Sequence, residues 1–107
     1  MDTADDKIDY WFYQQTLELY HQTKETLDVL IEWDKHRRLH LLGFRSDAAE
    51  QAYRAIVMST FASLHNMATL IRESRGLIKV RWVTLLREIE ICEMKYRPLI
   101  ELAISAF

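Results

Sequence analysis

The last third of the chain has a hydrophobic residue at nearly every third or fourth position. The series is Ile78, Trp82, Leu85, Ile89, Cys92, Tyr96, Ile100, Ala103 and Phe107. This spacing is typical of one face of an α-helix, and it predicts that a C-terminal helix packs along that face. The middle of the chain has a second series, with small residues beside it: Ala49, Tyr53, Ile56, Thr60, Leu64, Met67 and Ile71. We therefore expect a second helix that approaches its neighbour closely.

The rare turn-forming residues set the helix boundaries. No Gly or Pro precedes Gly43, so the sequence predicts one continuous first helix from Lys7 to about Leu42, with Asp6 as its cap. Gly43 suits the left-handed position that follows a helix. We then expect the second helix to begin at Asp47.

That start has the form of a capping box, Asp47-Ala48-Ala49-Glu50, with Glu50 at the third helical position. The second helix should run to about Arg75 and stop at Gly76. These boundaries leave the rest of the chain for the third helix.

The third helix is expected from about Ile78 to the C-terminus. Pro98 should kink or break it, because proline lacks a backbone donor and crowds the preceding turn. The chain has 107 residues, with two Gly, one Pro and no internal repeat or linker. The sequence therefore predicts a single all-α domain, residues 1–107, built as an antiparallel bundle of three long helices.

Charge and cysteine content narrow the classes of function. Lys and Arg number 14 against 16 Asp and Glu, for a net charge of -2, so no overall field attracts nucleic acid or an anionic membrane. The single Cys92 and an acidic start unlike a signal peptide favour a cytoplasmic location. The uncharged stretch 55–71 is shorter than a membrane span needs, and we interpret it as the buried centre of a helix.

The first helix has more apolar surface than one core requires. Its polar residues form a narrow stripe at heptad spacing: Gln14, Glu18, His21, Glu25, Asp28, Glu32 and Lys35. Hydrophobic residues occupy both flanks, Ile8, Phe12, Leu19, Leu30 and Trp33 on one and Tyr13, Leu17, Tyr20, Leu27 and Ile31 on the other. Residues 10–13 are four consecutive aromatics, whose side chains point around nearly the whole helix at about 100° per residue.

Single exposed aromatic residues are normal in monomers, but this many rings at one helix end favour an interface. We expect a surface that binds a second copy and another protein, since two-fold dimers are the commonest oligomers. The expected interface residues are Tyr10, Trp11, Phe12, Tyr13, Leu17 and Tyr20.

Basic residues near the second connection give an alternative function. Arg72, Arg75, Lys79 and Arg81 could hold a phosphate or nucleic acid through guanidinium groups and free helix donors. The competing interpretation is salt bridging to Glu73, Glu88 or the acidic N-terminus.

The residue spacings that could indicate a metal site or a catalytic site are weak. Glu18, His21 and Glu25 have the spacing of carboxylate-bridged metal sites, but no second motif of this kind occurs. The series Glu32, His36 and His40 lies on one face and could bind a metal or respond to pH. We predict that Cys92 is buried and inert, with a raised pKa, and that His65 lies in the core or in an interface.

No motif identifies a family or a nucleophilic site. The sequence therefore favours a small non-enzymatic interaction, regulatory or assembly protein that needs no cofactor or metal. The alternatives are the nucleic-acid or nucleotide module and, third, a metal-dependent helical-bundle enzyme.

Overall fold

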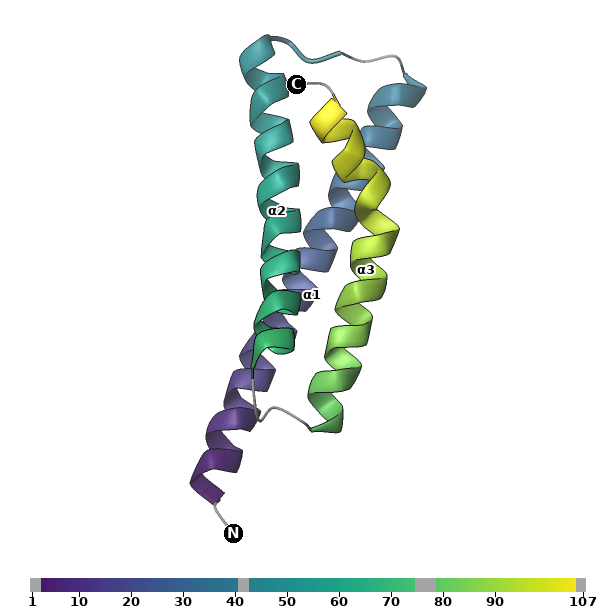
Figure 1. Ribbon diagram of the computed structural model, residues 1–107. Coiled ribbons are helices and arrows are strands. Elements are labelled where there is room, and N and C mark those ends of the chain that lie inside the picture. The colour runs from purple at the N-terminus through teal and green to yellow at the C-terminus, as the bar shows by residue number, and fades with distance from the viewer. Residues whose placement is uncertain (1–2, 41–42, 75–78, 106–107) are drawn as a thin grey trace.

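The computed structural model describes residues 3–40, 43–74 and 79–105, and within these ranges the only regular elements are three helices. They are α1 (Thr3–Leu39), α2 (Asp47–Glu73) and α3 (Val80–Ser105). Figure 1 shows that α1 runs from one end of the molecule to the other, α2 returns and α3 runs back again. The result is a rod of 60 × 22 × 19 Å, which agrees with the predicted all-helical bundle.

The first helix begins earlier than expected. Asp6 lies inside the first turn together with Asp5, so the predicted Asp6 cap is wrong. Acidic side chains in a first turn are favourable because they face the positive end of the helix dipole. The predicted end at Leu42 lies outside the described residues, but the last α-helical residue is Leu39.

The second helix is capped by Ser46 and not by Asp47. The Ser46 hydroxyl accepts a hydrogen bond from the Ala49 backbone N–H at 3.1 Å, so the capping position lies one residue before the predicted one. Glu50 therefore lies beyond the capping box, and its carboxylate accepts a hydrogen bond from Arg54.

The second helix also ends early, at Glu73, because the Ser74 N–H turns back to the Ile71 carbonyl at 3.3 Å. The predicted stop at Arg75 and Gly76 and the start at Ile78 lie outside the described residues. Helix α3 continues through Pro98, so the predicted break is absent, while a kink at Pro98 stays a prediction.

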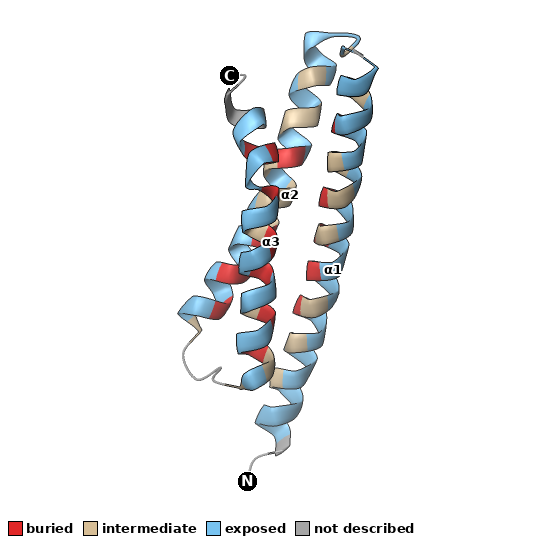
Figure 2. Cartoon of the chain, turned by 90° about the vertical axis from the view of Figure 1, so that its right-hand side faces the viewer, coloured by how far each residue is buried: buried red, intermediate tan, exposed pale blue. Residues whose placement is uncertain are grey.

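The core confirms the predicted face of the third helix. Trp82, Leu85, Ile89, Cys92, Tyr96 and Ile100 are all buried. In Figure 2 the buried and half-buried residues of α1 lie on the side that faces the other two helices. From the second series, Leu64, Met67 and Ile71 are buried, but Ile56 is exposed and its neighbour Val57 takes the core position.

The buried side of α1 is unusually polar. Thr16 and Thr23 are buried, and each hydroxyl donates to a carbonyl four residues earlier, at 2.9 and 2.8 Å. Asp34 is buried and pairs with Arg37 and Arg38 at 3.1 and 2.9 Å. Each of the three buried side chains thus has a hydrogen-bond or ion-pair partner within α1, which is what allows its burial.

Candidate functional site

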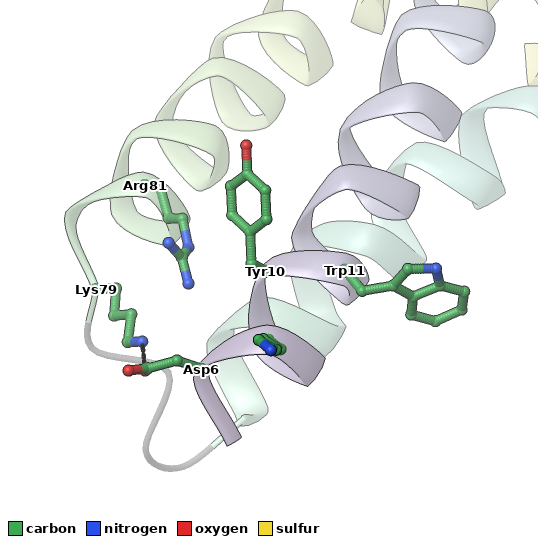
Figure 3. A pocket seen from close by; sticks show the side chains of 6 residues that line it. Asp6, Tyr10, Trp11, Lys79 and Arg81 are labelled. Atoms are coloured by element: carbon green, nitrogen blue, oxygen red, sulfur yellow. Dashed lines mark hydrogen bonds and ion pairs between the residues drawn. The ribbon is translucent and has the colours of Figure 1, made fainter. Parts of the chain in front are cut away.

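The N-terminal third of α1 carries the aromatic residues that do not fit the core. Tyr10, Trp11 and Phe12 are 48%, 60% and 39% exposed, and Ile8 beside them is also exposed. We call these four residues the aromatic end. In Figure 3, Tyr10 points toward the start of α3, whereas Trp11 points to another side of α1. The expectation that a single chain cannot bury all the rings of this segment is confirmed.

Three residues of the expected interface pack wholly or partly on the core. Tyr13 and Leu17 are partly buried against the core, and the Tyr13 ring meets Trp82 edge to face at 5.5 Å. Tyr20 is buried, and its hydroxyl donates to the Glu88 carbonyl at 3.5 Å. Burial, with the nearby Cys92 and Glu88, raises the pKa of Tyr20 to about 12. Tyr20 is therefore a core residue, and its assignment to the interface is wrong.

A hollow lies on each side of the aromatic end. One, of about 430 Å³, is lined by Asp6, Lys7, Tyr10, Trp11, Lys79 and Arg81 and is drawn in Figure 3. The other, of about 320 Å³, is lined by Asp5, Ile8, Asp9, Phe12, Leu70 and Ser74. Exposed rings beside hollows can seat the projecting side chains of a protein partner.

The basic cluster is paired with carboxylates. Lys79 binds Asp6 and lies 3.9 Å from Asp9, and Arg81 also binds Asp9. These are the pairs with the acidic N-terminus that the salt-bridge interpretation expects. Arg72 pairs with Glu90 at 2.9 Å, and not with Glu73 or Glu88, while Arg75 lies outside the described residues.

Asp9 fixes the start of α3 against α1. Its carboxylate accepts hydrogen bonds from Arg81 and, at 2.9 Å, from the Trp82 indole N–H. Burial opposes ionisation, but these two hydrogen bonds and the charges of Arg81 and Lys79 outweigh it and lower the pKa of Asp9 below 3.8. The ionised form of Asp9 is therefore stabilised by folding.

This pKa shift predicts a stability that depends on pH. Because the pKa of Asp9 is lower in the folded than in the unfolded chain, its contribution is present above the ordinary pKa of 3.8 and is lost as the pH falls below that value. We expect Asp9→Asn to lower the urea midpoint of unfolding at neutral pH, and the difference from the wild type to shrink toward pH 3. A difference that stays constant as the pH falls would contradict this role.

The proposed metal ligands do not converge. No group of three His, Cys, Asp or Glu side chains within the described ranges could hold a metal ion. One helix carries all three residues of the first motif, and they are exposed: Glu18, His21 and Glu25. The rings of His36 and His40 contact each other, with a centroid distance of 4.5 Å. The geometry of the described residues therefore does not support the interpretation of these side chains as a metal centre.

Two predictions about single residues can be compared with the structure. Cys92 is buried, and burial raises the pKa of its thiol, as expected. His65 is mostly exposed, with its Nδ1 atom 3.5 Å from Glu93, so it is not a core residue, while its place in an interface stays a prediction.

Two features were not predicted from the sequence. Trp33, Phe44 and Tyr53 form a second aromatic cluster near the other end of the rod, with centroid distances of 4.7 to 5.5 Å. The uncharged stretch 55–71 is only partly buried, contrary to our interpretation, and half of α2 faces outward there. The prediction of burial depended on the absence of charged residues from this stretch. That absence does not distinguish a buried helix from an exposed uncharged one.

A comparison with protein-family models, curated proteins and solved structures finds no significant match to this chain. Among the described helices, none combines the length and the apolar character needed to span a membrane.

Proposed function

We propose that this protein is a non-enzymatic interaction module, which associates with itself and binds a protein partner through the aromatic end of α1. The observation that carries the proposal is the exposure of Tyr10, Trp11 and Phe12 on a helix whose other side already packs on the core. Large aromatic side chains dominate the energetics of protein interfaces. A two-fold dimer of antiparallel three-helix units would cover them most simply.

The same proposal includes a reducing, cytoplasmic location. Cys92 is the only cysteine of the chain and is buried, so no disulfide stabilises the fold. The nucleic-acid alternative has less support, because Lys79 and Arg81 already pair with Asp6 and Asp9.

Replacement of Trp11 by Ser tests this function. We expect the dimer dissociation constant from sedimentation equilibrium to rise at least about thirtyfold, since a hot-spot side chain contributes about 2 kcal/mol and a two-fold dimer loses it in both copies. The matched control is Ile91→Ser on α3, because Ile91 and Trp11 are both 60% exposed. A wild type that stays monomeric at micromolar concentration, or equal effects of the two substitutions, would contradict the proposal.

A further inference from the structure

Two residues of the aromatic end, Ile8 and Phe12, belong to a stripe that runs along nearly the whole of α1. Eight exposed residues alternate in spacing between four and three positions: Ile8, Phe12, Gln15, Leu19, Gln22, Thr26, Val29 and Trp33. None of them carries a charge. A spacing of four and three residues is the pattern with which one helix packs along another in a left-handed supercoil. This side of α1 therefore has the sequence of a helix-packing face, although neither of the other two described helices covers it.

Helix α2 has a second stripe with the same spacing. Its residues are mostly small: Ala49, Ala52, Ile56, Ser59, Ser63, Asn66 and Leu70. All are exposed except Ser63, which is half-buried. Between residues 55 and 71 this helix has no Asp, Glu, Lys or Arg, even though much of its surface is exposed there. Solvated helix faces normally carry charged residues, so an uncharged one of this length indicates a covered surface.

The two stripes lie side by side. At one end, Ile8 and Phe12 of α1 line a hollow together with Leu70 of α2. At the other end, Trp33 of α1 packs on Tyr53 of α2, a half-buried residue next to the stripe residue Ala52, at a centroid distance of 4.7 Å. We call the surface formed by both stripes the α1–α2 face. It has a bulky row on α1 next to a row of small residues on α2.

We propose that the α1–α2 face binds the same face of a second copy, so that α1 and α2 of both copies form a four-helix interface. This inference rests on the proposed function and specifies its self-association. A two-fold axis places the bulky row of each copy over the small row of the other, and the two uncharged faces do not repel each other. Size complementarity of this kind is what close helix packing requires.

The area of the face is sufficient for a stable dimer. Helix α2 has 27 residues, so the face is about 40 Å long and, with two helices, about 20 Å wide, or about 800 Å² per copy. That value matches the area of about 800 Å² that each partner buries in a standard interface.

The outer side of α3 is the rival surface. Val83, Ile91 and Met94 are exposed there, but Arg87 lies among them and is also exposed. Burying an unpaired guanidinium group is unfavourable, so this side is less suited to a two-fold contact that would bring two Arg87 side chains together.

The test introduces a charge into the middle of each stripe. Ser59→Glu on α2 and Gln22→Glu on α1 both change exposed residues, and the second keeps the size of the side chain. The matched control is Met94→Glu on α3, where Met94 is 71% exposed. Sedimentation equilibrium gives the dissociation constant of each dimer, and circular dichroism shows that each variant is folded.

We expect Ser59→Glu and Gln22→Glu each to raise the dissociation constant at least about tenfold, because the two-fold axis duplicates every introduced charge. Met94→Glu should leave it within about twofold of the wild type. If Trp11→Ser weakens the dimer but neither central charge does, the inference is overturned while the proposed function stands. A dimer that is disrupted by Met94→Glu alone would place the interface on α3 and overturn the inference as well.

Discussion

Replacement of Trp82 by Ala is expected to lower the free energy of unfolding by about 3–5 kcal/mol, the usual cost of removing a buried aromatic ring. Trp82 is fully buried at the start of α3. Its ring contacts Phe12 and Tyr13 at centroid distances of 5.8 and 5.5 Å, and its indole N–H donates to Asp9. The substitution therefore leaves a cavity between α1 and α3 and removes one hydrogen bond of the half-buried Asp9 carboxylate. Urea unfolding at one fixed protein concentration measures the loss, because the proposed dimerisation would make stability depend on concentration.

The control for this substitution is the next residue. Val83 is 53% exposed, so Val83→Ala should change the free energy of unfolding by no more than about 0.5 kcal/mol. A variant Trp82→Phe keeps a ring but loses the hydrogen bond to Asp9, and its stability should lie between those of the wild type and the alanine variant. If Trp82→Ala cost no more than Val83→Ala, the packing of α1 on α3 described above would be wrong.

The core face of α3 was predictable because a single geometric rule determines it. When one side of a helix packs on its neighbours, the residues on that side recur every three or four positions, as they do from Trp82 to Ile100. The same rule placed Leu64 and Ile71 correctly on α2. It failed at Ile56, because Ile56 and Val57 are adjacent and equally hydrophobic, and the choice between them depends on where α1 and α3 lie.

The two hydrophobic flanks of α1 show that periodicity alone does not determine which side of a helix faces the core. The sequence showed apolar residues on both sides of a polar stripe, and the flank with Leu17, Tyr20 and Leu27 is the one that meets the core. On the other flank Leu30 packs partly on the core, whereas Ile8, Phe12, Leu19 and Trp33 remain exposed. Only the direction from which α2 and α3 approach α1 decides this, and that direction depends on contacts between distant residues.

Contacts between distant residues also determine which carboxylates pair with the basic cluster. Lys79 and Asp6 are far apart along the chain, and their pairing requires the starts of α1 and α3 to lie at the same end of the rod. The sequence named the acidic N-terminus as one possible partner, but it could not choose between that and Glu73 or Glu88. The cap of α2 was missed for a local reason, because Ser46 and Asp47 are both good capping residues and stand side by side.

Replacement of Pro98 by Ala is expected to raise the free energy of unfolding by about 2 kcal/mol. Proline is about 3 kcal/mol less favourable than alanine inside a helix, and about 1 kcal/mol of this is offset because the unfolded chain becomes more flexible. Pro98 is exposed within α3, so alanine creates no cavity there. The new N–H can donate to the carbonyl four residues earlier, that of Met94.

The competing effect concerns the residues that follow Pro98. Leu99 and Ile100 pack against Val57 of α2, and a kink at Pro98 would direct them toward it. If that kink is needed, straightening the helix withdraws two apolar side chains from the core, and Pro98→Ala becomes destabilising. Pro98→Gly separates the two effects. Glycine also restores the backbone N–H donor, but it is about 1 kcal/mol less favourable than alanine inside a helix. Urea unfolding that ranks alanine above glycine and glycine above proline shows that the missing hydrogen bond dominates, whereas proline ranking first shows that the kink contributes to packing.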